Sequence, residues 1–154
     1  MSAPSHEIVS TRLLAWPREA VFPAFADPAR LARWWGPKGF TSEFQRFEFR
    51  PGGAWRFVMR GPDGTAFAMD KEFTDIVPPA RIALRHFQEG HDFTLTMTLA
   101  DRDGKTELAW RMNFADAAEA ERLRPFLKRA NEENFDRLEA HLKESVSGPP
   151  GLAR

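Results

Sequence analysis

The histidines are the residues of this chain best suited to move a proton near neutral pH. There are four of them, and no pair has the spacing of a zinc-binding HExxH motif. The chain has no cysteine, which excludes thiolate nucleophiles, disulfides and cysteine-ligated zinc. We therefore expect neither a metal nor a cofactor. The four histidines are His6, His86, His91 and His141.

His86 is the histidine whose position most favours a role at a binding site. It follows Ile82 and Leu84 at alternate positions, so in a strand it should face the same covered side. A buried imidazole there could orient a polar group of a ligand, or act as an acid or base. The alternative is a structural histidine that is satisfied within the core or lies at its rim.

Two other groups of polar residues lie within apolar patterns. Asp70, Lys71 and Glu72 interrupt an apolar strand, so one or two of them must face inward or lie at a bulge. Carboxylates two residues apart on one face could perform acid–base chemistry, although a solvated strand edge is the simpler interpretation. Asn131 and Asn134 lie near the apolar side of the last expected helix. An inward amide needs a partner, which is a ligand, a buried water or a neighbouring protein group.

Several classes of function have no support in the motifs or the charge. The chain lacks the GxSxG, GxGxxG and P-loop patterns, and Arg50-Pro51-Gly52-Gly53 reads as a tight connection. Lys and Arg number 22, as do Asp and Glu, and this balance argues against binding to nucleic acid or to a membrane surface. No signal peptide or membrane-spanning run is visible, and the lack of cysteine fits a reducing compartment, so we expect a cytoplasmic protein.

The apolar composition indicates a large interior that is either solid or hollow. Among 154 residues there are 14 Phe, 5 Trp and 5 Met, but no Tyr. Trp34 and Trp35 end a short expected helix, where one of them could line the mouth of a cavity, or both could be core. Nine other aromatic and methionine residues are expected to face inward, as core or as cavity lining. They are Trp55, Phe57, Met59, Phe67, Met69, Phe73, Trp110, Met112 and Phe135.

These residues need elements to position them, and the N-terminal third predicts a strand followed by two short helices. The strand covers Glu7–Leu14, and Pro17 suits the first turn of a helix that runs to about Ala26. Pro23 falls inside that helix and should kink or shorten it. Asp27 as N-cap and Pro28 start a second helix, which Gly36-Pro37-Lys38-Gly39 ends after Trp35.

The rest of the chain predicts a sheet and one long helix. Alternation of apolar and polar residues indicates strands near 44–50, 55–60, 66–76, 81–87, 92–100 and 106–114. A single apolar stripe then runs from Asp116 to about Lys143, at the spacing of a helix. We expect one α+β domain over residues 7–143, a curved antiparallel sheet of six or seven strands wrapped around the C-terminal helix, and a flexible tail over 144–154.

The chain resembles a known superfamily in several segments that occur in the same order. They are AWPREAVF from Ala15, DPARLARWWGP from Asp27, FRPGG from Phe49 and IVPPARI from Ile76. Together they resemble the START-like superfamily, and within it single-domain homologues of the activator of the 90-kDa heat-shock chaperone ATPase, over about residues 7–143. Two departures, Trp16 in place of a small residue and Pro23 in the helix, fall where the family has one wall of its cavity.

This resemblance implies the helix-grip fold, with a cavity between sheet and C-terminal helix that holds a small hydrophobic molecule, lipid-like or aromatic. Binding without catalysis is favoured. The alternatives are a polyketide cyclase/dehydratase-like enzyme using the same cavity, and a stress-related co-chaperone of the 90-kDa chaperone. A homodimer is a further expectation of the family. The residues expected to line the cavity are Trp35, Trp55, Phe57, Met59, Met69, His86, Trp110, Asn131 and Phe135.

Overall fold

Residues 6–87 and 92–147 are described by a computed structural model of the chain. Seven strands and three helices form within these residues. In chain order they are β1 (Glu7–Leu14), α1 (Arg18–Ala26), α2 (Pro28–Trp34), β2 (Thr41–Phe47), β3 (Ala54–Arg60), β4 (Ala66–Val77), β5 (Arg81–His86), β6 (Phe93–Arg102), β7 (Lys105–Phe114) and α3 (Ala117–Ser147). Of the sequence predictions, His91 and the tail beyond Ser147 lie outside the described residues.

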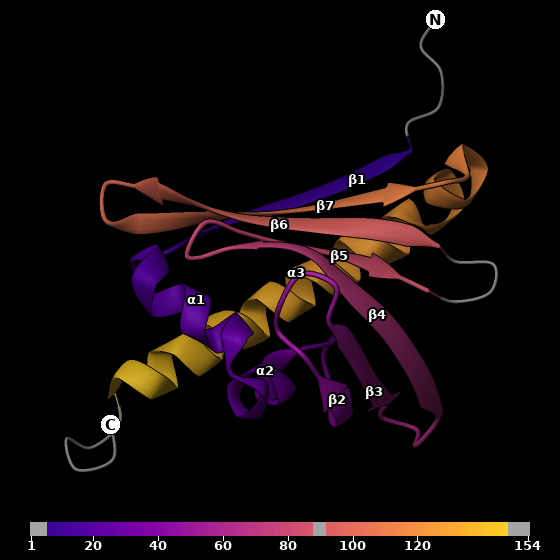
Figure 1. Ribbon diagram of the computed structural model, residues 1–154, viewed down its shortest axis with the longest axis horizontal. Coiled ribbons are helices and arrows are strands. Elements are labelled where there is room, and N and C mark those ends of the chain that lie inside the picture. The colour runs from indigo at the N-terminus through magenta and orange to yellow at the C-terminus, as the bar shows by residue number, and fades with distance from the viewer. Residues whose placement is uncertain (1–5, 88–91, 148–154) are drawn as a thin grey trace, which may run out of the picture.

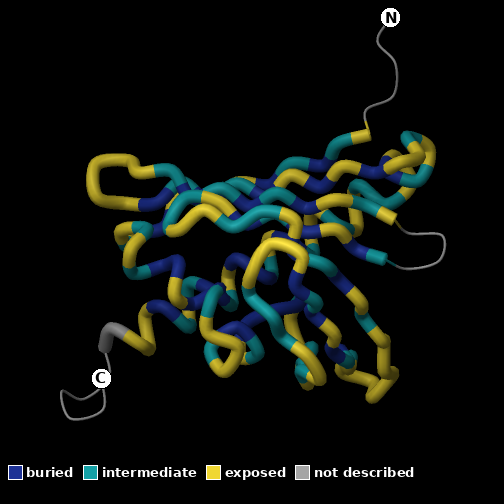
Figure 2. Tube along the Cα trace, in the orientation of Figure 1, coloured by how far each residue is buried: buried dark blue, intermediate teal, exposed yellow. Residues whose placement is uncertain are grey.

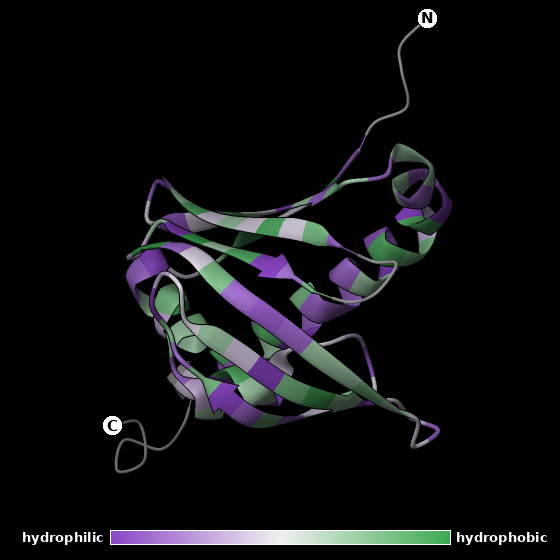
Figure 3. Ribbon diagram, turned by 45° about the vertical axis from the view of Figure 1, so that its right-hand side comes forward, coloured by the Kyte–Doolittle hydropathy of each residue, from purple (hydrophilic) through white to green (hydrophobic). Residues whose placement is uncertain are grey.

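The strands form one antiparallel sheet in the order β1-β7-β6-β5-β4-β3-β2. The sheet curves, and α3 lies obliquely across its concave face, with α1 and α2 beside the lower part of the helix (Figure 1). Hydrophilic and hydrophobic residues alternate along the strands (Figure 3), because successive side chains of a strand point to opposite faces. This is the expected α+β architecture, a curved sheet around a C-terminal helix.

The core fills the space that the sheet, α1, α2 and α3 enclose. Buried stretches concentrate there, while the ends of the hairpins are exposed (Figure 2). The helix α3 contributes Phe135, Leu138 and Leu142, all fully or almost fully buried, and these belong to its predicted apolar stripe. Arg12 on β1 reinforces the contact with α3 through ion pairs with Glu132, at 2.7 Å, Asp136 and Glu139.

Two short helices form as their N-terminal signals predict. Asp27 caps α2, because its side chain accepts a hydrogen bond from the backbone N–H of Ala29 at 3.0 Å. Pro23 lies inside α1 and removes one backbone donor, yet the helix still reaches Ala26, so Pro23 does not shorten it.

Three element ends differ from the sequence prediction by three residues or more. The strand β2 covers Thr41–Phe47, where the pattern suggested 44–50, and α3 ends at Ser147, where it suggested about Lys143. The shift of β2 follows from the tight connection after it. There Gly53 lies so close to Glu48 that a Cβ on Gly53 would be 2.0 Å from the Glu48 carbonyl oxygen. Residues 48–53 therefore belong to the turn, as Arg50-Pro51-Gly52-Gly53 indicated.

Candidate ligand-binding pocket

A cavity of about 290 Å³ lies between the concave face of the sheet and α3. Its sheet wall includes Met59, Met69, Leu95 and Met112. The helix wall comes from Phe126, Leu127, Ala130, Asn131 and Asn134, and the segment after α2 adds Trp35, Gly36, Pro37 and Phe40. Most of these side chains are apolar, as expected of a pocket for a hydrophobic molecule.

The nine residues predicted to line a cavity separate into two groups. Five of them lie on the pocket wall: Trp35, Met59, Met69, Trp110 and Asn131. The other four are buried in the layer behind the wall: Trp55, Phe57, His86 and Phe135. Alternation along a strand gives the face on which a side chain lies, but not whether another side chain covers it.

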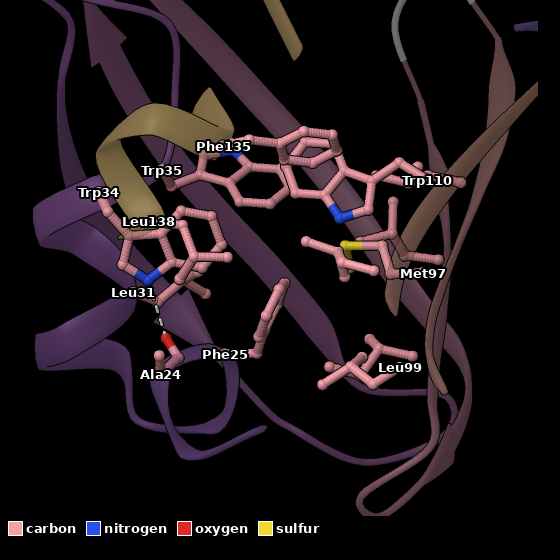
Figure 4. Packing of buried hydrophobic residues seen from close by; sticks show 14 of the residues in the cluster. Ala24, Phe25, Leu31, Trp34, Trp35, Met97, Leu99, Trp110, Phe135 and Leu138 are labelled. Atoms are coloured by element: carbon pink, nitrogen blue, oxygen red, sulfur yellow. Dashed lines mark hydrogen bonds between the residues drawn. The ribbon is translucent and has the colours of Figure 1, made fainter. Parts of the chain in front are cut away.

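At the end of the pocket nearest α2, aromatic rings cover the residues that lie behind the wall. The Trp35 ring lies 5.0 Å from the Trp55 ring and 5.2 Å from the Trp110 ring, measured between centroids. Phe135 packs edge-on against Trp110 at 4.9 Å (Figure 4). This part of the interior is therefore solid, and the pocket begins beyond Trp35 and Trp110. The indole N–H groups of Trp55 and Trp110 are buried with no hydrogen-bond acceptor among the described residues.

The adjacent tryptophans that end the second helix have different roles. Trp34 is fully buried, and its indole Nε1 donates to the carbonyl oxygen of Ala24 at 3.1 Å (Figure 4). Trp35 is 6% exposed and lies on the pocket wall. Trp34 is thus a core residue that joins α1 to α2, while Trp35 faces the pocket.

Two side chains of α3 fasten the pocket wall that follows α2. Asn134 accepts a hydrogen bond from the backbone N–H of Gly36 at 3.1 Å and donates to the Trp34 carbonyl oxygen at 2.7 Å. The Arg137 guanidinium donates to the carbonyl oxygens of Gly36 at 3.0 Å and Pro37 at 3.1 Å. These bonds satisfy backbone groups that no strand or helix pairs, and they fix this wall relative to α3.

Gly36 is the residue that allows the chain to turn at this wall. Its φ is +108°, and a Cβ there would be 2.9 Å from the Met59 sulfur. A larger residue would therefore be strained in backbone conformation and would push into the pocket wall. The sequence correctly assigned Gly36 to a turn.

The charged member of the pocket wall is Lys71, which the sequence prediction did not include among the site residues. Lys71 is only 4% exposed, and its Nζ lies 3.0 Å from Nδ1 of His86. The rings of Phe93 and Phe57 are 5.5 and 6.0 Å from the same nitrogen. Burial among these groups lowers the pKa of Lys71 from about 10.5 to about 7, because the charged form loses its hydration.

Alternation in β4 explains why Lys71 points inward. Met69 and Phe73 face the interior, so Lys71 between them must do the same, while Asp70 and Glu72 face outward. Asp70 pairs with Arg56 of β3 at 3.5 Å on that outer face. The prediction that one member of the Asp-Lys-Glu segment faces inward is therefore correct, and that member is the lysine. The Asp70 and Glu72 carboxylates belong to the outer face, which fits a solvated position better than acid–base chemistry in the interior.

His86 is inward, as its spacing indicated, but it lies behind Lys71. It is 2% exposed, and its ring stacks on Phe93 at 4.7 Å. In the sheet it is the direct partner of Lys71 across β4 and β5. His86 therefore reaches the pocket through the Lys71 amine and does not itself form part of the wall.

The mouth of the pocket is marked by exposed aromatic side chains. Phe126 of α3 is 60% exposed and Phe67 of β4 is 41% exposed, although both line the pocket. Phe40 packs against Phe67 with ring centroids 6.3 Å apart. Large apolar side chains that remain in water at a cavity entrance are typical of an interaction site.

Neither a metal cluster nor a membrane-spanning helix is found within residues 6–87 and 92–147. No group of three or more histidine or acidic side chains in these ranges could hold a metal ion. No helix there has the length and apolar character needed to cross a membrane.

Comparison with known proteins places the chain by both sequence and fold. The model of the family described as "Activator of Hsp90 ATPase homolog 1-like protein" matches residues 15–143.

Two curated relatives are the proteins named activator of 90 kDa heat shock protein ATPase homolog 1 of mouse and human. The mouse protein is 42% identical over 57 residues, which are 34% of this chain and 17% of the relative. The human protein is 34% identical over 91 residues, which are 56% of this chain and 25% of the relative. The chain thus spans a quarter or less of each.

Solved structures share the fold over almost the whole chain. A crystal structure of a protein from Nitrosomonas europaea aligns with a TM-score of 0.85 at 19% identity, and covers 96% of this chain and 100% of that one. At this identity the likeness is one of fold.

Proposed function

The chain belongs to the family of activator of Hsp90 ATPase homolog 1-like proteins, and on this premise we propose that it binds a small hydrophobic molecule. The observation that carries the proposal is the apolar cavity of about 290 Å³ between the sheet and α3. Ligand pockets have volumes of about 300–1,000 Å³, so a ligand of this pocket is small. Three methionines on the wall, Met59, Met69 and Met112, are flexible and can adapt to apolar ligands of differing shape.

A pocket-filling substitution tests this proposal with the uncharged fluorescent probe N-phenyl-1-naphthylamine. The wild-type protein should bind the probe and increase its fluorescence, because the pocket is apolar. Met69→Trp places a larger side chain in the pocket and should weaken binding by about tenfold or more, which is about 1.4 kcal/mol. Fluorescence titration gives the dissociation constants.

The control for this test is Ala68→Trp, which adds the same side chain one residue away. Ala68 is exposed and points to the opposite face of β4, so this variant should bind the probe as the wild type does. Equal affinity of Met69→Trp and the wild type, with both folded, would show that the probe does not occupy this pocket.

A second candidate function is an enzyme acting on a polyketide-like substrate in the same pocket. The Lys71–His86 pair favours it, because an amine with a pKa near 7 is suited to general acid–base catalysis near neutral pH. If a polyketide-like substrate is turned over by the wild type, and His86→Ala still binds it without turnover, the enzyme gains support. Failure of the wild type to convert any such substrate leaves binding as the function.

A third candidate is contact with the 90-kDa heat-shock chaperone. It rests on the names of the curated relatives, of which this chain spans a quarter or less. Titration of the chaperone's ATPase with stoichiometric protein tests it directly. A rise in ATPase rate supports a co-chaperone, and a flat titration excludes it.

A further inference from the structure

Lys71 presents hydrogen-bond donors to the pocket that the described protein does not use. An ammonium group has three N–H donors, and Nδ1 of His86 at 3.0 Å is an acceptor for one of them. The other close neighbours are the rings of Phe93 and Phe57, at 5.5 and 6.0 Å. Within residues 6–87 and 92–147, no carboxylate forms an ion pair with Lys71. A buried cation in an apolar pocket therefore has donors left for a ligand.

We propose that the pocket takes a hydrophobic carboxylic acid, whose carboxylate pairs with Lys71 while its apolar body lies between the sheet and α3. This inference rests on the proposed function and names the chemical class of the ligand. A carboxylate has two oxygens that can accept hydrogen bonds from the remaining N–H groups. Its single negative charge balances the single positive charge of the ammonium.

The two asparagine amides of the pocket wall are already engaged by the protein. The side-chain amide of Asn134 forms hydrogen bonds through both its oxygen and its nitrogen, with the backbone of Gly36 and Trp34 respectively. The Asn131 amide nitrogen donates to the Ser10 hydroxyl at 3.2 Å and contacts the Met112 sulfur. Among the described wall residues Lys71 is the one that carries a charge, so it determines which charged end a ligand has. One lysine without an arginine or a second cation suits a monoanion better than a phosphate dianion.

The same arrangement makes binding of the acid depend on pH. Of the groups near Lys71, His86 of β5 faces it, whereas Asp70 and Glu72 of β4 and Arg56 of β3 lie on the outer face of the sheet. Burial brings the pKa of Lys71 to about 7, so the unoccupied pocket loses its positive charge as the pH rises above that value. The affinity for a carboxylate should then fall by up to about tenfold per pH unit between pH 7 and 9, while the affinity for an uncharged ligand stays constant.

Competition between decanoic acid and 1-decanol for N-phenyl-1-naphthylamine tests the proposal, because the two differ only in the polar end. At pH 7 the wild type should bind the acid about tenfold more tightly than the alcohol, a difference of about 1.4 kcal/mol. Lys71→Met should still bind the probe and decanol, but it should lose the preference for the acid. Lys38→Met removes an exposed lysine from the segment after α2 and should keep the preference.

The outcomes separate this inference from the proposed function. If the probe binds but the wild type does not distinguish acid from alcohol, the inference is wrong and the pocket remains a binding site. A preference that survives in Lys71→Met contradicts it equally. If the wild type binds neither the probe nor decanoic acid added directly in a calorimeter, the proposed function falls as well.

Discussion

Lys71→Met should stabilise the protein against unfolding by about 3 to 4 kcal/mol at pH 6. The difference between a pKa of about 10.5 in the unfolded chain and about 7 in the folded protein corresponds to about 5 kcal/mol, at 1.36 kcal/mol per pH unit. Methionine avoids this cost because it is similar in length and uncharged. Loss of the hydrogen bond to His86 reduces this gain in the free energy of unfolding by about 1 kcal/mol.

The sign of this effect follows from proton binding. The folded protein holds the Lys71 proton less tightly than the unfolded chain, so protonation favours unfolding. The cost of burying the ammonium is complete below about pH 7, shrinks between pH 7 and 10.5, and vanishes above that range. The advantage of Lys71→Met over the wild type should therefore disappear near pH 10.5.

Urea unfolding of both proteins at pH 6 and pH 10 measures this advantage. Lys38→Met, at an exposed position, should change the free energy of unfolding by less than about 0.5 kcal/mol at either pH. A loss of stability in Lys71→Met at pH 6, or a gain that does not change with pH, would contradict the burial of an ionisable amine. A buried ammonium such as that of Lys71 lowers the stability of the fold, and such a destabilising group is expected at a site where function requires it.

Asn134→Ala should destabilise the protein by about 3 kcal/mol and weaken probe binding. The variant leaves the Gly36 N–H and the Trp34 carbonyl oxygen without their partner in a buried site, and each unsatisfied group costs about 1–3 kcal/mol. The same bonds hold the pocket wall after α2 against α3, so their loss should also loosen the position of Trp35. Urea unfolding and titration with N-phenyl-1-naphthylamine measure the two effects.

Arg129→Ala is the matched control for Asn134→Ala, since Arg129 is exposed on the same helix. This change should leave both stability and probe binding close to the wild type. If Asn134→Ala proves no less stable than Arg129→Ala, then Asn134 does not fasten the segment after α2.

The elements of the fold could be predicted because their patterns are local. Alternation of apolar and polar residues predicted each strand. The apolar stripe that includes Leu138 and Leu142 predicted α3 and its buried side. The strand β2 was misplaced by three residues because its end depends on the close approach of Gly53 to Glu48, a contact that side-chain periodicity does not encode.

The pocket could be predicted only in part. The inward faces of the strands were correct, but whether a ring such as Trp55 lines the cavity depends on Trp35, which reaches over it from another element. The sequence prediction did not place Lys71 in the pocket, because it assigned the possible chemistry of this segment to the carboxylates of Asp70 and Glu72. Strand alternation through Met69 and Phe73 already assigned Lys71 to the interior, so that signal was present in the sequence.

The most direct test of the pocket as a binding site is a methyl NMR spectrum of protein labelled with ¹³C at its methionines. Met59, Met69 and Met112 line the pocket, whereas Met97 is 2% exposed in the core and is not on the wall. Titration with 1-decanol should shift the three pocket resonances strongly and saturably, and shift Met97 much less. Resonances of Met59, Met69 and Met112 that do not move, or that move no more than Met97, would contradict the binding of a hydrophobic molecule between the sheet and α3.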